Sequence, residues 1–344
     1  MKSKITTHLL ALTVGTIFFV NSIFIADAAT NELFDLNTKA MDAFKQGNYE
    51  LAIAYFGKII QLNSNNADGY CGRGEVFSYE KKYAEAIADL NESIRLKPSA
   101  YAYAFRGEAY SQKKDTAKAL EDYTESIKLN PNNGKVYFLR AKQYFHLHYF
   151  VAALADCNTA ILILSDAPDT DGSLEMAYFY RGGVFNNMRK FDRASDDFTK
   201  VIQISPTNAT PYNLRGWACL WMGKYDKAIE DFKKSIQLNP KDELPYRRLA
   251  WIMATCPDEK YRDGQKALEN SKKACELTAW KEPLDLITIA AAYAELGNFE
   301  QSVIWEQKAI ELGLKDQDSK DSQERLELYK QKKPFRIKMP IMTK

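Results

Sequence analysis

The stretch ATPYNLRGWACLWMGKYDKAIEDFKKSIQLNPKD, residues 209–242, reads as two short amphipathic helices joined by a tight turn. Gly216 lies on the apolar face of the first helix and Ala228 on that of the second, each flanked by aromatic or aliphatic residues at helical spacing. Gly223 ends the first helix, and Pro240 prevents the second from continuing because its ring leaves no N–H to donate. Neither helix can bury its apolar face alone, so the pair must pack against neighbours.

The small residues matter because Gly216 and Ala228 fall where the two helices cross most closely. This order of small and aromatic positions resembles the tetratricopeptide repeat, a helix-turn-helix unit of about 34 residues. Arg215 stands where the repeat pattern has Leu, and Cys219 stands where it has Tyr. The matching positions are Tyr212, Arg215, Gly216, Cys219, Ala228, Phe232 and Pro240.

The pattern recurs along the chain at intervals close to about 34 residues, which is typical of a repeat array. The small residue of each second helix is found at Ala52, Ala86, Ala119, Ala153, Ala194, Ala228, Ala267 and Ser302. An independent Arg-Gly or Arg-Ala step occurs at Arg73-Gly74, Arg106-Gly107, Arg140-Ala141, Arg181-Gly182 and Arg215-Gly216. The resemblance covers roughly residues 33–315 and implies an all-α fold, a right-handed α-solenoid (superhelix) of about eight such units.

The repeats divide the chain into a leader, an array, a cap and a tail. We expect a leader at 1–28, a tetratricopeptide array at 29–316, a capping helix at 317–333 and a basic tail at 334–344 that is solvated and frayed. An anion-binding tail is the alternative. The expected units are 33–66, 67–99, 100–133, 134–174, 175–208, 209–242, 243–282 and 283–316. Two insertions are expected, a loop over 166–172 and a segment over 256–264.

Composition agrees with a large helical body of ordinary charge. The 344 residues are 46% hydrophobic, and 47 basic residues nearly balance 45 acidic ones. Nothing in this balance indicates a nucleic-acid binder. Cys157 and Cys219 occupy apolar stripe positions and should pack as small hydrophobes, and no disulfide is expected among the five cysteines.

The first 28 residues have the pattern of a secretory signal. Lys2 and Lys4 precede an apolar run from Leu9 to Ile25, and Ala26-Asp27-Ala28 supplies small residues for cleavage before Ala29. The expectation is therefore an exported protein, periplasmic or secreted. The alternative is an uncleaved anchor, because the apolar run is close to the roughly 17 residues that span a bilayer. Membrane contact is expected only in that second case.

No catalytic or metal-binding pattern appears in the sequence. His146 and His148 are two residues apart on an expected helix and so point to different faces. Glycine-rich phosphate loops and nucleophile elbows are lacking in the sequence. We therefore expect a protein that is not an enzyme and uses no cofactor or metal.

The resemblance implies a binding surface, because the first helices of such arrays line a concave groove. In the second repeat, residues 67–99, the groove positions are small and polar: Asp68, Cys71, Glu75, Ser78 and Tyr79. Later units differ, with aromatic, amide and basic residues of the kind found in binding sites. The candidate groove residues are Phe138, Phe145, His146, Phe179, Asn186, Asn187, Asn213, Trp217, Trp221, Arg247 and Trp251.

Two structural alternatives stay open for these residues. Trp217 and Trp251 hold equivalent positions in adjacent units, so one ring can pack on the other across the seam; otherwise Trp217, Trp221 and Trp251 form one exposed patch. The repeated arginines are expected to be structural, with their stems between units and their guanidinium groups on acidic neighbours or carbonyls.

Function is expected to be non-enzymatic binding of a protein or peptide segment in the concave groove. The carboxylate clamp of chaperone-binding relatives needs Lys and Asn at set groove positions, and no unit here has that set. Two alternatives remain, a glycan or cell-wall ligand stacked on the aromatics and an architectural adaptor that uses the convex face.

Overall fold

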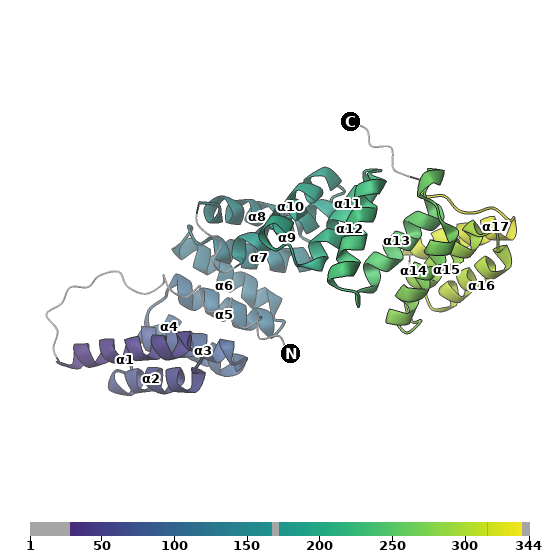
Figure 1. Ribbon diagram of the computed structural model, residues 1–344. Coiled ribbons are helices and arrows are strands. Elements are labelled where there is room, and N and C mark those ends of the chain that lie inside the picture. Colours follow the sequence, from purple (N-terminus) through teal and green to yellow (C-terminus); the bar gives the residue numbers. More distant parts are fainter. Residues whose placement is uncertain (1–27, 167–171, 315, 339–344) are drawn as a thin grey trace. The chain divides into compact units, whose positions relative to one another are not determined.

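The computed structural model describes residues 28–166, 172–314 and 316–338, and over these ranges the chain is helical with no strand (Figure 1). Residues 1–27 of the predicted leader at 1–28, most of the loop at 166–172 and the last six residues of the tail lie outside the described residues. The helices are α1 Ala28–Lys45, α2 Tyr49–Leu62, α3 Ala67–Tyr79, α4 Tyr83–Leu96, α5 Ala100–Gln112, α6 Thr116–Leu129, α7 Gly134–His146, α8 Phe150–Leu164, α9 Ser173–Asn187, α10 Phe191–Ile204, α11 Ala209–Trp221, α12 Tyr225–Leu238, α13 Glu243–Thr255, η1 Glu259–Tyr261, α14 Gly264–Leu277, α15 Pro283–Glu295, α16 Phe299–Glu311 and α17 Asp316–Lys330.

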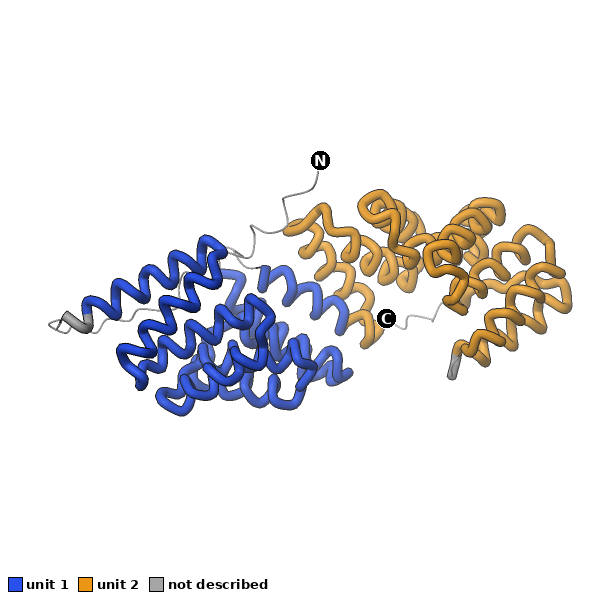
Figure 2. The backbone as a smooth tube through the Cα atoms, turned by 90° about the horizontal axis from the view of Figure 1, so that it is seen from below, with its two compact units in different colours: residues 1–184 blue, residues 185–344 orange. Residues whose placement is uncertain are grey.

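The chain forms two compact units, residues 1–184 and residues 185–344 (Figure 2). In the first unit α1–α2, α3–α4, α5–α6 and α7–α8 pack as pairs, and each second helix packs on the next first helix. In the second unit α11–α12, α13–α14 and α15–α16 do the same, and α17 packs on α16. The predicted fold class, an all-α solenoid of helix-turn-helix pairs, is confirmed.

Small residues let the two helices of each pair approach closely, as the sequence predicts. The repeated alanines and Ser302 have no solvent exposure. A Cβ added at Gly216 would lie 2.8 Å from the Phe232 ring and 3.2 Å from the carbonyl oxygen of Ala228. Only a residue without a side chain fits this crossing.

A left-handed residue reverses the chain between the helices of most pairs. Glycine holds this position in some pairs, as at Gly223 with φ +70°. In others an ordinary residue is held there, as at Lys81 with φ +61°, a region in which a Cβ is strained. The equivalent turn residues are Gly47, Lys81, Lys114, His148, Arg189, Gly223 and Gly297.

Four arginines at equivalent positions each join the two helices of their own pair. We call them the arginine ladder: Arg73, Arg106, Arg140 and Arg215. In each, Nε and Nη2 donate to both oxygens of an aspartate on the second helix, at 2.6–2.9 Å. The aspartates are Asp89, Asp122, Asp156 and Asp231. The guanidinium groups also lie over aromatic rings, such as that of Tyr212 beneath Arg215. The structural role predicted for these arginines is confirmed.

Three of the ladder arginines also connect their pair to the one before it. The third nitrogen, Nη1, donates to a polar side chain on the preceding second helix: Asn91 from Arg106, Thr124 from Arg140 and Thr199 from Arg215, at 2.6–3.1 Å. Arg181 makes the equivalent bond to Asn158 at 2.9 Å. The ladder stops at the next pair, where Leu249 holds its position.

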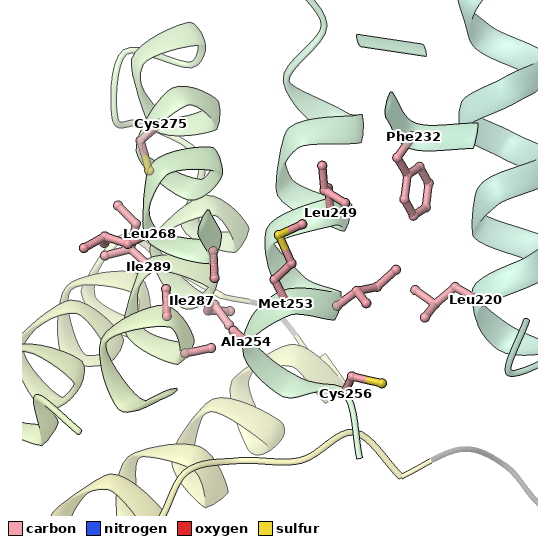
Figure 3. Close-up of a cluster of buried hydrophobic side chains, with 14 of the residues drawn as sticks. Leu220, Phe232, Leu249, Met253, Ala254, Cys256, Leu268, Cys275, Ile287 and Ile289 are labelled. Carbon is pink, nitrogen blue, oxygen red and sulfur yellow. The ribbon is translucent and has the colours of Figure 1, made fainter. Parts of the chain in front are cut away.

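The core of the second unit is a continuous cluster between helix pairs (Figure 3). Phe232 and Leu220 face Leu249 and Met253 of α13, and the cluster continues to Leu268, Ile287 and Ile289. All five cysteines are free thiols and buried, and Cys157 and Cys219 pack as small hydrophobes as predicted. Burial raises the pKa of the Cys275 thiol to about 12, so it is protonated at neutral pH.

The array ends on α17, which covers the last pair. Leu326 is 6% exposed and Tyr329 is fully buried against Ala290 and Ala294 of α15. Arg325 donates from Nε to the buried Glu306 at 2.9 Å.

The chain then turns back, and residues 335–337 pack on α13 rather than extending into solvent. The expectation of a solvated, frayed tail is therefore wrong for these residues. The reason is that Phe335 and Ile337 are apolar and find partners in the second unit.

Candidate functional site

Two tryptophans on α11 form an aromatic corner in the second unit. Trp217 and Trp221, four residues apart, meet edge to face with ring centroids 5.5 Å apart. Trp221 also stacks on Phe191 of α10 at 6.1 Å, and the Arg189 guanidinium lies 5.9 Å from its centroid. Both tryptophans are partly buried. Part of each ring is accessible to solvent, and the rest packs against neighbouring side chains.

Arg248 of α13 lies over the face of Trp217, with its guanidinium 4.6 Å from the ring centroid. Its Nη1 donates to the side-chain oxygen of Asn213 at 2.8 Å and to the Asn213 carbonyl at 3.1 Å. Among the described residues no acid pairs with Arg248, and its Nε and Nη2 donate to nothing. Burial and the neighbouring Arg247 together lower the pKa of Arg248 to about 10, while Asp242 and Glu243 oppose the shift. The site thus holds a partly exposed cation whose Nε and Nη2 make no hydrogen bond within the described residues.

Arg247, one of the predicted groove residues, makes a structural contact within the second unit. Its Nη1 donates to Oδ1 of Asp285 on α15 at 3.2 Å, and Asp285 is fully buried. Thr278 donates to the other oxygen of Asp285 at 2.8 Å. Burial raises the pKa of Asp285, while Thr278 and Arg247 oppose that shift. This pair joins α13 to α15, so Arg247 holds the two helices together.

Trp251 is engaged by the C-terminal segment. Its ring centroid lies 5.8 Å from that of Phe335, and the guanidinium of Arg325 lies 5.8 Å from the Trp251 centroid. The ring partner of Trp217 is Trp221, while that of Trp251 is Phe335. The structure therefore joins two of the three predicted rings directly and places a segment of the chain itself on the third.

In the first unit the predicted aromatics gather around Tyr180 of α9. The rings of Phe138, Phe145, His146 and Phe179 all lie 5.5–6.0 Å from it. Phe138 is only 8% exposed and belongs to the hydrophobic core of this unit. His146 is the exposed member, and partial burial together with Lys142 and His148 lowers its pKa. This cluster is largely packing, with a solvent-facing edge at His146.

The two asparagines at the end of α9 differ from each other. Asn187 is exposed, whereas Oδ1 of Asn186 is buried and accepts no hydrogen bond within the described part of the chain. A ligand role for Asn186 and Asn187, as for the other candidate groove residues, stays a prediction. Glu75, which the sequence placed among the small and polar groove positions, is only 3% exposed.

The sequence analysis missed Arg248, Arg189 and Tyr180. Arg248 lies one residue beyond a position that the repeat pattern assigns to the groove. A signal was present, because no acidic residue stands three or four positions from Arg248 on its helix. An arginine on a mostly apolar helix without a local partner is a candidate for binding an anion.

No group of His, Cys, Asp or Glu side chains among the described residues is arranged to hold a metal ion. None of the helices described is both long enough and apolar enough to cross a membrane.

Comparison with known proteins agrees with the geometry. Models of the tetratricopeptide repeat match residues 37–101, 100–133 and 209–242. These stretches of the chain are tetratricopeptide repeats, helical units of a class that typically binds other proteins and is typically not enzymatic.

Curated relatives share only a short stretch with it. Protein SGT1 homolog of Oryza sativa subsp. japonica is 34% identical over 73 residues, which is 21% of this chain and 20% of that protein. Human serine/threonine-protein phosphatase 5 is 35% identical over 71 residues, 21% of this chain and 14% of that one. The chain thus spans about a fifth or less of the length of these relatives.

Among solved structures, the C-terminal part of a tetratricopeptide repeat-containing protein from Cytophaga hutchinsonii superposes with a TM-score of 0.53. The alignment covers 70% of this chain and 94% of that one, at 19% identity. This likeness shows the fold alone.

Proposed function

We propose that this chain is an exported, non-enzymatic scaffold that binds a protein or peptide segment on the first-helix surface of its second unit. The term first-helix surface denotes the partly exposed side chains of α11, α13 and α15. Successive first helices contact one another, α11 with α13 and α13 with α15, so they form one continuous support.

The observation that carries the proposal is Arg248. A guanidinium partly removed from water costs free energy unless an anion compensates it; Asp242 and Glu243 act on Arg248 through space, but no acid of the described chain forms an ion pair with it. Its free Nε and Nη2 match a carboxylate in the planar, two-bond geometry that arginine favours. Trp217 beneath it and Trp221 beside it supply apolar contact for the residues flanking that carboxylate. The partner segment is therefore acidic with apolar neighbours.

The test compares capture of envelope proteins by the chain from Ala29 to Lys344 with capture by its Arg248→Gln variant. Arg95→Gln is the matched control, because Arg95 is exposed on α4 and pairs only with Glu92 beside it. We expect Arg248→Gln to lose the captured protein and Arg95→Gln to retain it. Capture by the wild-type chain should weaken as salt rises from about 0.05 to about 0.5 M, because ion pairs at a surface are screened.

A stability measurement makes this test sharper. Removal of a partly buried cation that forms no ion pair within the described chain should leave the melting temperature of Arg248→Gln unchanged or raised, even as binding is lost. A large fall in melting temperature would show that Arg248 is structural. Equal capture by the wild-type chain and by Arg248→Gln would refute the proposal. Salt-independent retention of the wild-type chain on purified cell-wall glycan would favour the glycan alternative.

Export is proposed from the pattern of residues 1–28 alone. N-terminal sequencing of protein recovered outside the cytoplasm should begin at Ala29 or within a residue or two of it. Recovery of intact Met1 in the membrane fraction would favour an anchored protein.

A further inference from the structure

The C-terminal segment after α17 lies on the end of α13. The backbone N–H of Ile337 donates to the carbonyl of Thr255 at 3.0 Å, and Nη1 of Arg336 donates to the carbonyl of Ala254 at 3.2 Å. In the close-up of the core, the pale yellow C-terminal segment passes beside the end of α13, near Cys256 (Figure 3).

These contacts use carbonyls that the helix itself leaves open. The last carbonyls of any α-helix have no partner within it, and here Pro257 stops the helix abruptly after Cys256. The carbonyl of Met253 is satisfied by the N–H of Asp263, which follows η1. The next two carbonyls, of Ala254 and Thr255, receive the C-terminal segment.

The side chains of the segment are matched one by one. Phe335 lies against Trp251 at 5.8 Å, and Ile337 packs against the core of the second unit. Arg336 forms an ion pair with Glu295 of α15, with Nη2 and Oε2 2.6 Å apart. Nε of Arg262 holds the other oxygen of Glu295 at 3.0 Å, so this carboxylate is fixed in place before the segment arrives.

The surface that receives these contacts is formed mainly by α13 and α15, with Arg325 and Tyr329 of α17 beside Phe335. Trp251, the carbonyls of Ala254 and Thr255, and Glu295 present an aromatic wall, two acceptors and an anion in order along it. Any extended segment with an aromatic residue, an arginine and an aliphatic residue in succession can make the same contacts. Selectivity comes from the side chains. The backbone N–H that donates to the Thr255 carbonyl is present in nearly any segment, so it does not distinguish one sequence from another.

We propose that this surface is a peptide-binding site for extended aromatic–arginine–aliphatic segments, and that residues 335–337 of the chain are its tethered occupant. The site differs in charge from the one at Arg248, which attracts a carboxylate; this one attracts a cation through Glu295. It deepens the proposed function by adding a second ligand class on the first-helix surface. Because the occupant is covalently attached, its effective concentration is in the millimolar range, and external segments must compete with it.

The experiment measures binding of a fluorescein-labelled peptide, Lys-Pro-Phe-Arg-Ile-Lys, to the full chain by fluorescence anisotropy. In the variant Phe335→Ala, Arg336→Ala, Ile337→Ala the tethered competitor is removed. We expect this variant to bind the peptide at least about tenfold more tightly than the wild-type chain does. Adding Glu295→Gln to the variant should weaken binding at least about fivefold, and a peptide with Glu in place of its arginine should not bind.

Circular dichroism of each variant checks that it is folded. If the triple variant loses helix content, Arg336→Gln takes its place, because it keeps the Phe335 and Ile337 contacts and removes only the ion pair with Glu295. It should then bind the peptide at least about threefold more tightly than the wild type. A folded variant that fails to bind the peptide, or that binds a scrambled peptide equally well, overturns the proposal.

The result separates this inference from the proposed function. Peptide binding should be unchanged by Arg248→Gln, since Arg248 makes no contact with the C-terminal segment among the contacts described. Loss of envelope-protein capture in Arg248→Gln with normal peptide binding, or the reverse, identifies which of the two sites is wrong.

Discussion

Replacement of Glu75 by glutamine should change how the stability of the first unit depends on pH. Glu75 lies on α3 and is 3% exposed. Burial, with a smaller contribution from Glu108 on α5, raises the pKa of its carboxyl from 4.5 to about 8, and Lys135 on α7 opposes the shift. The side chain is therefore neutral in the folded chain at pH 7 and ionised in the unfolded one.

The sign and size of the effect follow from proton linkage. Between pH 4.5 and about 8 the unfolded chain releases a proton that the folded chain retains, so the stability that this group contributes is complete below pH 4.5 and is lost as pH rises through 8. Each pH unit in this window is worth about 1.4 kcal/mol, which gives a total on the order of 5 kcal/mol. Glutamine is nearly isosteric and never ionises, so Glu75→Gln should abolish this loss.

The assay is urea denaturation followed by circular dichroism at pH values from about 4 to about 9, since all five tryptophans lie in the second unit and do not report on the first. We expect Glu75→Gln to match the wild type near pH 4 and to be more stable by several kcal/mol above pH 8. Hydrogen exchange at α3 should show the same trend. The control is Glu85→Gln, at an exposed position on α4. Parallel pH profiles for wild type and Glu75→Gln would refute the reasoning.

Three further stability predictions follow from the repeat geometry. Lys81→Gly should raise the free energy of unfolding by about 1 kcal/mol, because φ at this turn is +61°, whereas Lys81→Ala should give no such gain in the same urea titration. Gly216→Leu should lower it by at least about 1–3 kcal/mol, read from tryptophan fluorescence, since even a Cβ would meet the Phe232 ring at 2.8 Å. Arg215→Met should cost about 3–5 kcal/mol by leaving the buried Asp231 unpaired; if Arg215→Met with Asp231→Leu is equally unstable, the ion pair is not the cause.

The repeat could be predicted from the sequence because its signal is local and recurrent. Gly216 and Ala228 mark the crossing of one pair, and the same pattern at Ala86 or Ala119 marks others, so each unit supports the assignment of the next. The side-chain period then fixes which face of a helix is buried.

The binding surface could be predicted only in part. The repeat pattern predicts on which face of its helix a residue lies, but not how deeply its side chain is buried. Phe138 points as a groove residue should, yet it is packed in the core of the first unit. Arg247 has the expected position but is held by Asp285, 38 residues away in the chain. The docking of Arg336 on Ala254 joins residues 82 apart, and no local pattern encodes such a contact.

The arginine ladder bears on how such an array can change its length. Each ladder arginine forms its ion pair with an aspartate of its own helix pair. From the preceding pair it needs only a hydroxyl or amide oxygen as a hydrogen-bond acceptor, as Arg140 has in Thr124 and Arg106 has in Asn91. Gene duplication or deletion of a whole repeat among these pairs therefore leaves no buried carboxylate stranded. Beyond Leu249 the rule changes, because Arg247 depends on an aspartate in the following pair. Recombination should accordingly be tolerated among the ladder repeats and selected against at the junction of α14 and α15.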